Sequence, residues 1–202
     1  MQVILERVHS NVCGPFSTAT TAKHGYYVIF VDDFPRKCWI FFMKKKDQTF
    51  SNFLEFKALV EKELGNQVKA LRSDNGGEYI YGKFKEFCSV EGIRGELIAP
   101  HNPQQNGVAK RKNRMIVGAA WVMLHDQGLP IHLWAEACNT AVYVKNHCPH
   151  RVLGMSTPEE VFSGKKPDIS HLKIFGSPVY IHVMKDARKK LEPTGWDICG
   201  VH

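Results

Sequence analysis

Three short segments of this sequence carry the polar side chains whose types and spacing could do chemistry. Residues 9–15 read HSNVCGP, residues 71–78 read LRSDNGGE, and residues 103–114 read PQQNGVAKRKNR. The second segment places Asp74 just before a pair of glycines, and this pattern taken by itself also fits a plain turn. The third segment ends in a basic run, which favours contact with phosphate groups but also fits a solvated helix face.

The basic run consists of Lys110, Arg111, Lys112 and Arg114. If this stretch is helical, Lys110 and Arg114 are four residues apart and lie on one face. Three polar residues that could also reach a bound nucleic acid precede the run on a predicted loop: Gln104, Gln105 and Asn106.

His9 and Cys13 have an offset that metal ligands can have, but no second pair of ligands lies near them in the sequence. We interpret them as ordinary residues at the end of a strand. All six cysteines are spread along the chain without a Cys-x-x-Cys pair. That argues against a disulfide framework and a zinc ribbon, and it favours a reducing intracellular compartment.

The elements that must position these segments follow from hydrophobic periodicity and from glycine and proline breaks. The expected order is β-β-β-α-β-α-β-α-α, a three-stranded meander that leads into a βαβ half. The run at residues 26–31 is aromatic and β-branched throughout, which predicts a strand buried on both faces. The remaining strands are expected at 3–12, 38–43, 68–71 and 93–98, the helices at 47–64, 84–90, 105–127, 132–146 and 158–163, and a strand or hairpin at 173–183.

Composition bounds the class of protein. The 202 residues suit one large domain or a core with a short extension, and 44% of them are hydrophobic. The formal net charge of +7 is compatible with a polyanionic partner such as DNA, although charge alone is weak evidence. The sequence contains no signal-peptide pattern and no apolar run of about 18 residues. We therefore expect an intracellular protein with no membrane partner.

Taken together, the three polar segments resemble the integrases of copia-type LTR retrotransposons. In that family they read H-S-D-V-C-G-P, R-S-D-N-G-G-E and P-Q-Q-N-G-V-A-E-R-K-N-R. The resemblance covers about residues 5 to 185. Five further stretches are similar to the family's C-terminal extension: Leu129-Pro130, Trp134 to Ala137, Thr157-Pro158, Gly164 to Pro167 and His171 to Gly176.

This resemblance implies an RNase H-like α/β fold, a five-stranded mixed sheet flanked by helices, with a helical and hairpin extension. The expected division is a catalytic core at residues 1–128 and the extension at 129–202. In the family, three carboxylates hold two divalent ions, Mg²⁺ or Mn²⁺, which serve DNA 3′-processing and strand transfer. The loop and basic run described above are implied to contact DNA through Gln104, Gln105, Asn106, Arg111, Lys112 and Arg114.

The sequence departs from the family at the acidic triad. The family's first Asp falls on Asn11 and its Glu falls on Lys110, with thirty-five residues between Asp74 and Lys110, so only Asp74 remains acidic. Asn11 is neutral and the charges of Asp74 and Lys110 cancel, whereas the family's triad carries three negative charges. An ammonium at a ligand position repels a divalent cation, since two unit charges about 4 Å apart interact by roughly 4 kcal/mol at an effective dielectric constant of about 20. We expect no bound metal. We expect Lys110 to pair with the Asp74 carboxylate directly or through a water molecule, and Asn11 to donate a hydrogen bond to the same carboxylate.

We therefore interpret the chain as a retrotransposon integrase core that keeps its fold and a weak affinity for DNA but has lost catalysis. DNA is the expected partner, further copies of the chain or other integrase subunits are possible assembly partners, and the nucleus is the expected location. Two alternatives stay open from the sequence. One is a domesticated module that binds another protein without catalysis, and the other is an inert relic of a transposon.

Overall fold

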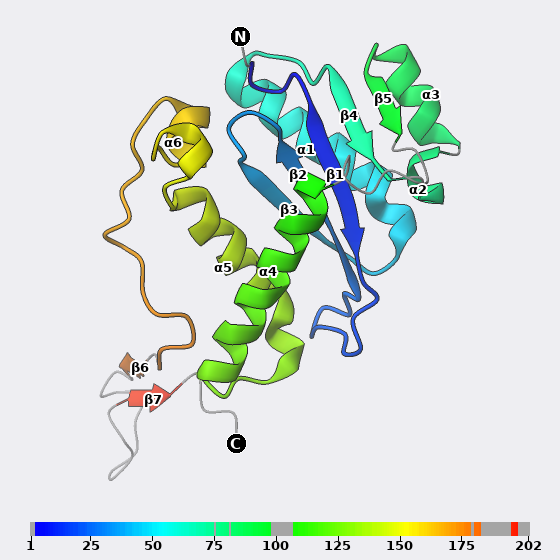
Figure 1. Ribbon diagram of the computed structural model, residues 1–202. Helices are drawn as coiled ribbons and strands as arrows, with labels where there is room; N and C mark the ends of the chain where they lie inside the picture. The colour runs from blue at the N-terminus through cyan, green and yellow to red at the C-terminus, as the bar shows by residue number, and fades with distance from the viewer. Residues whose placement is uncertain are drawn as a thin grey trace.

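The computed structural model describes residues 3–74, 76–80, 82–97, 107–178, 180–182 and 195–197. Five strands form one mixed sheet in the order β3-β2-β1-β4-β5 (Figure 1). Strands β1, β2 and β3 are antiparallel neighbours, and β4 and β5 run parallel to β1. The strands are β1 (Val8–Cys13), β2 (Tyr26–Asp32), β3 (Cys38–Met43), β4 (Ala70–Ser73) and β5 (Arg94–Leu97).

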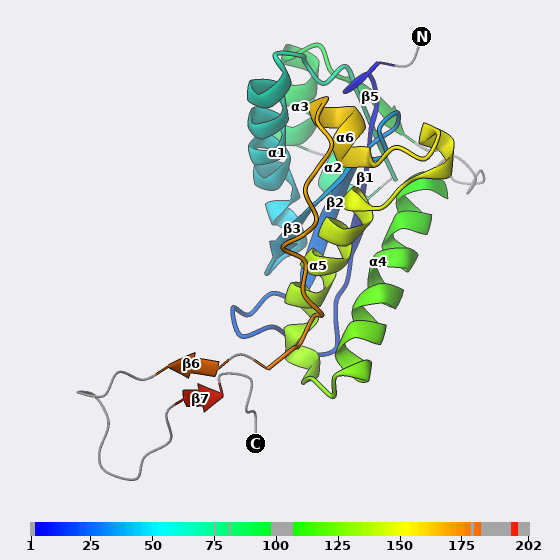
Figure 2. The same ribbon diagram turned by 90° about the vertical axis from the view of Figure 1, so that its left-hand side faces the viewer.

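Helices cover both faces of this sheet. Helix α1 lies on one face and α4 and α5 lie on the other, as the two perpendicular views show (Figures 1 and 2). The α-helices are α1 (Thr49–Leu64), α2 (Gly77–Ile80), α3 (Lys83–Val90), α4 (Gly107–Asp126), α5 (Trp134–His147) and α6 (Pro158–Ser163). Short 3-10 helices lie at η1 (Lys46–Gln48), η3 (Ile131–Leu133) and η4 (Arg151–Leu153).

Strand β2 is buried on both faces, as the sequence predicts. Val28 and Phe30 belong to the hydrophobic cluster on the α1 face, where the Phe30 ring stacks on that of Phe56 with centroids 4.5 Å apart. Tyr27 and Ile29 belong to the cluster under α4 and α5. Because neighbouring side chains of a strand point to opposite faces, this alternation gives the sheet two hydrophobic cores.

The expected fold class and element order are confirmed, with differences at the boundaries. The first strand begins at Val8 rather than at residue 3, and the loop after Asp74 leads into the short helix α2. The strand or hairpin predicted at 173–183 is wrong at residues 173–178, which form no strand, whereas residues 180–182 form β6 (Tyr180–His182). Strand β6 pairs with β7 (Gly195–Asp197) in an antiparallel two-stranded sheet.

Helix α5, in the expected extension, shares a hydrophobic cluster with α4. Trp134 and Ala137 pack in the same cluster as Ile116 of α4 and Ile29 of the sheet. The division of the chain at residue 128 stays a prediction. None of the helices in the described part of the chain is both long and apolar enough to cross a membrane.

Candidate active site

Asn11 and Asp74 meet at the centre of the sheet because β1 and β4 are parallel neighbours. His9 pairs with Arg72 in the β1–β4 register, so Asn11 and Asp74, each two residues further on, lie on the same face. The Asn11 side-chain amide donates a hydrogen bond from Nδ2 to Oδ2 of Asp74 at 3.1 Å. The other carboxylate oxygen of Asp74 accepts the backbone N–H of Gly76 at 3.2 Å. The expected contact between Asn11 and the carboxylate is therefore confirmed.

A third side chain, Asn113 of helix α4, also belongs to this site and was not predicted from the sequence. Asn113 of α4 donates from Nδ2 to Oδ1 of Asn11 at 2.6 Å, and each of the two side chains is only 8% exposed. A chain of hydrogen bonds thus runs from Asn113 through Asn11 to Asp74. The spacing held a signal for this role, because Asn113 lies three residues after Lys110 and close to it around a helix.

Lys110 does not pair directly with Asp74, which was one of the two forms of contact that we expected. Its side chain is exposed, and among the described residues no ion pair or hydrogen bond joins it to the carboxylate. The reason lies in the orientation of α4, which turns Ala109, Asn113 and Ile116 toward the sheet. Lys110 lies beside these buried residues, and its side chain is exposed to solvent.

The structure divides the predicted basic run into two sets. Arg111 and Arg114 are exposed, but Lys112 is half-buried and its Nζ donates to the backbone carbonyl of Arg36 at 3.2 Å. The expected DNA-contacting residues Gln104, Gln105 and Asn106 lie outside the described residues.

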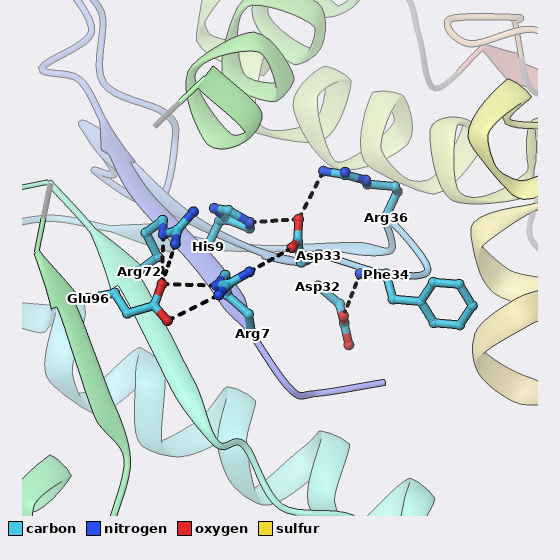
Figure 3. Close-up of polar contacts among 8 residues, drawn as sticks. All are labelled: Arg7, His9, Asp32, Asp33, Phe34, Arg36, Arg72 and Glu96. Carbon is cyan, nitrogen blue, oxygen red and sulfur yellow. Dashed lines mark hydrogen bonds and ion pairs between the residues drawn. The ribbon is translucent and has the colours of Figure 1, made fainter. Parts of the chain in front are cut away.

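Two other carboxylates, Asp32 at the last position of β2 and Asp33 just after it, make structural contacts of their own (Figure 3). Asp32 is fully buried and accepts the backbone N–H groups of Leu5 at 2.7 Å and Phe34 at 3.1 Å. Burial raises the pKa of Asp32 to about 6, although both backbone hydrogen bonds oppose this shift. Asp33 accepts a hydrogen bond from His9, and this contact lowers its pKa. Neither carboxylate can replace a lost ligand beside Asp74.

A network of charged side chains, also not predicted from the sequence, ties the strands together beside the site (Figure 3). Glu96 of β5 accepts from Arg7 Nε at 2.9 Å and from Arg72 Nε at 2.8 Å. Arg7 also donates to Asp33 at 3.2 Å, and His9 Nε2 lies 3.0 Å from the same carboxylate. These contacts join β5, β4, β1 and the end of β2, and they hold the register that brings Asn11 beside Asp74.

The side chains at this site do not fit a two-metal centre. Within the described ranges, no group of three or more histidine, cysteine or acidic side chains could hold a metal ion. Asp74 supplies one carboxylate, and its Oδ2 faces an N–H donor rather than a second anion. The Asn11 carbonyl oxygen, the remaining hard ligand, already accepts from Asn113. A divalent ion would have to break both amide contacts and would gain a single negatively charged ligand.

The sheet order and the flanking helices define the fold class as RNase H-like, with residues 11 and 74 at neighbouring parallel strands. Two solved structures share this fold. The simian T-cell lymphotropic virus intasome in complex with PP2A regulatory subunit B56 gamma matches with a TM-score of 0.66 and 17% identity, over 97% of this chain and 68% of that one. The HTLV-2 integrase catalytic core domain in complex with magnesium, in its trimeric form, matches with a TM-score of 0.58 and 20% identity, over 78% and 95% of the two chains.

Sequence comparison gives the family. The chain is 47% identical over 94% of its length to the retrovirus-related Pol polyprotein from transposon TNT 1-94 of Nicotiana tabacum, and 35% identical over 93% to that from transposon RE2 of Arabidopsis thaliana. It spans only 14% and 13% of the lengths of these relatives. No family model matches the sequence. The chain belongs to the copia-type Pol polyproteins and corresponds to their integrase core.

Proposed function

We propose that this chain is a DNA-integration core that has lost strand transfer but keeps its fold and binds DNA through backbone phosphates. The observation that carries the loss of catalysis is the Asn113–Asn11–Asp74 chain of hydrogen bonds. It supplies an amide donor and an amide acceptor where two divalent ions need an anionic oxygen cage. The site is therefore satisfied without a metal.

Support for the DNA partner comes from relatedness and from charge. One fold neighbour is described as an intasome and another as a catalytic core in complex with magnesium, in a trimeric form. The sequence carries a net charge of +7, and Arg111 and Arg114 are exposed on α4, the helix that covers Asn11. We propose DNA and further integrase subunits as partners, and the nucleus as the place where they meet.

The test of lost catalysis is reversion in the context of the full polyprotein segment with its flanking domains. The double variant Asn11→Asp/Lys110→Glu restores the acidic triad, and each single variant restores only half of the change. We expect the double variant alone to join DNA strands in the presence of Mn²⁺. Strand joining by the unaltered chain at a comparable rate would overturn the proposal.

Isothermal titration provides a second measurement that does not depend on activity. The unaltered chain should show no site for Mg²⁺ or Mn²⁺ tighter than the millimolar range, because a single carboxylate with an amide donor on it is a poor ligand set. A stoichiometry of two tightly bound ions would show that the site still works as a metal centre.

A further inference from the structure

A second polar feature, lined by neither Asn11 nor Asp74, lies beside helix α4. A pocket of about 390 Å³ lies between the first turns of α4, the turn that joins β2 to β3, and the end of α5 with the segment that follows it. Basic side chains line it from every wall: Arg36, Arg111, Lys112, Lys145 and His150. Cys148 adds a thiol, the remaining lining residues are apolar, and among the residues that the structure describes no aspartate or glutamate lines the pocket. We call this the α4–α5 basic pocket.

The positive charges of this pocket are poorly compensated. Within the described part of the chain, only Arg36 has an acidic partner, Asp33 at 3.3 Å, and that carboxylate also binds Arg7 and His9. Lys112 is half-buried, and the one hydrogen bond of its ammonium group goes to a neutral backbone carbonyl. Among the described residues, only one of the three N–H donors of this ammonium group therefore has a protein acceptor.

The positively charged side chains of the pocket repel one another. Burial lowers the pKa of Lys112, and the nearby positive charges of Lys145 and Arg36 lower it further against an opposing effect of Cys38. Burial also lowers the pKa of His150, with Lys112 and Arg36 adding to the shift. Like charges gathered in a partly desolvated space repel, and an anion placed among them relieves that repulsion.

The histidine of the pocket can donate to an anion without being protonated. Its Nδ1 accepts the backbone N–H of Val152 at 3.3 Å, at the start of η4. In the neutral ring the hydrogen therefore sits on Nε2, which is left as a donor. The pocket thus offers guanidinium, ammonium and imidazole N–H groups together, a set suited to an oxyanion with several acceptor oxygens.

We propose that the α4–α5 basic pocket binds a phosphate group, and that its source is a phosphodiester of the DNA backbone. The identity of the source rests on the proposed DNA-binding function, whereas the phosphate chemistry rests on the pocket alone. Lys112 and Lys145 are the principal ligands. The site contributes affinity without sequence specificity, because phosphate contacts carry no base information.

The test measures binding of a fluorescent DNA duplex to the full chain by anisotropy across a salt series. Lys112→Met keeps the aliphatic stem and removes the charge, and Lys145→Gln removes the second charge with little change in size. Lys62→Gln is the matched control, because it removes one exposed lysine from α1 on the opposite face of the sheet. We expect each pocket variant to lower affinity about tenfold, and the double variant to reduce the slope of log affinity against log salt by about 0.9, the value for one phosphate. The control should leave both quantities at the parental values.

A second arm separates this inference from the proposed function. Inorganic phosphate is titrated into the unaltered chain while the ring resonances of His150 are followed by NMR across a pH series, with melting curves to confirm that each variant is folded. Phosphate in the pocket should raise the pKa of His150, and Lys112→Met/Lys145→Gln should abolish the effect of phosphate.

If the duplex does not bind but phosphate raises the pKa of His150, the DNA source is wrong and the phosphate pocket is supported. If the duplex binds and the pocket variants behave like Lys62→Gln, the pocket is overturned while DNA binding stands. Failure of both arms overturns both ideas.

Discussion

Changing Asn11 back to aspartate should make the stability of this chain depend on a divalent metal. In the unaltered chain the Asn11 amide donates to Asp74 Oδ2 at 3.1 Å. Aspartate of the same shape would place two anionic oxygens at that separation. At an effective dielectric constant of about 20, two unit charges at that distance repel by about 5 kcal/mol, and a hydrogen bond to a carboxylate is lost as well. Since Asp74 is half-buried, water screens part of this repulsion, and we expect a net destabilisation of about 3 kcal/mol.

The assay is thermal unfolding with and without metal. For a chain of this size, about 3 kcal/mol corresponds to a fall of about 6 to 12 °C in Tm when EDTA is present. Mn²⁺ at about one hundred times its Kd would return about 2.7 kcal/mol by binding the folded state alone. The matched control is Asn113→Asp, which also breaks an amide hydrogen bond in this chain but puts no carboxylate beside Asp74. The reasoning fails if Asn11→Asp melts at the parental temperature in EDTA, or if Mn²⁺ stabilises both variants equally.

Three shorter predictions test other parts of the structure. Lys110→Glu alone should change the free energy of unfolding by no more than about 0.5 kcal/mol and give no stabilisation by Mn²⁺, because the side chain is exposed; calorimetric melts with and without metal check this. The raised pKa of Asp32 means that its folded form holds a proton more tightly, so its contribution to stability is complete below pH about 4 and disappears as the pH rises through about 6. Denaturant unfolding should show this loss in the parent and a flatter profile in Asp32→Asn, and equal slopes would contradict it. Phe30→Ala should cost about 3 to 5 kcal/mol in the same assay, because it removes a fully buried ring stacked on α1; a cost below about 1 kcal/mol would mean that the core repacks.

The parts of the fold that local patterns determine were predictable from the sequence. The both-face burial of β2 follows from its unbroken aromatic and β-branched run, and the long helix α4 follows from its period and from the stop at Gly128. Asn11 beside Asp74 could also be expected, because the resemblance places both at positions of one acidic triad. These inferences depend on spacing along one strand or helix, or on a shared family pattern.

What the sequence did not predict depends on how the helices are rotated and on contacts between distant residues. Whether Lys110 or Asn113 faces Asn11 is decided by a rotation of α4 about its axis, and both residues lie within one turn. Arg7 and Glu96 are 89 positions apart, and nothing in either local pattern links them. Lys112 looked like part of a surface run, and only the packing of α4 against the β2–β3 turn shows that it points into a pocket.

Asparagine at position 11, where the family has a metal-binding aspartate, also stabilises the fold in the absence of metal. Three carboxylates gathered at one site repel until cations neutralise them, so an active core of this family carries an electrostatic cost whenever the metal is absent. In this chain the amide of Asn11 turns that repulsion into a donor–acceptor pair, and Asn113 satisfies its remaining oxygen. Catalytic sites are commonly less stable than their non-catalytic variants for such reasons. If strand transfer is lost as we propose, the asparagine at position 11 contributes both to that loss and to the stability of the metal-free core.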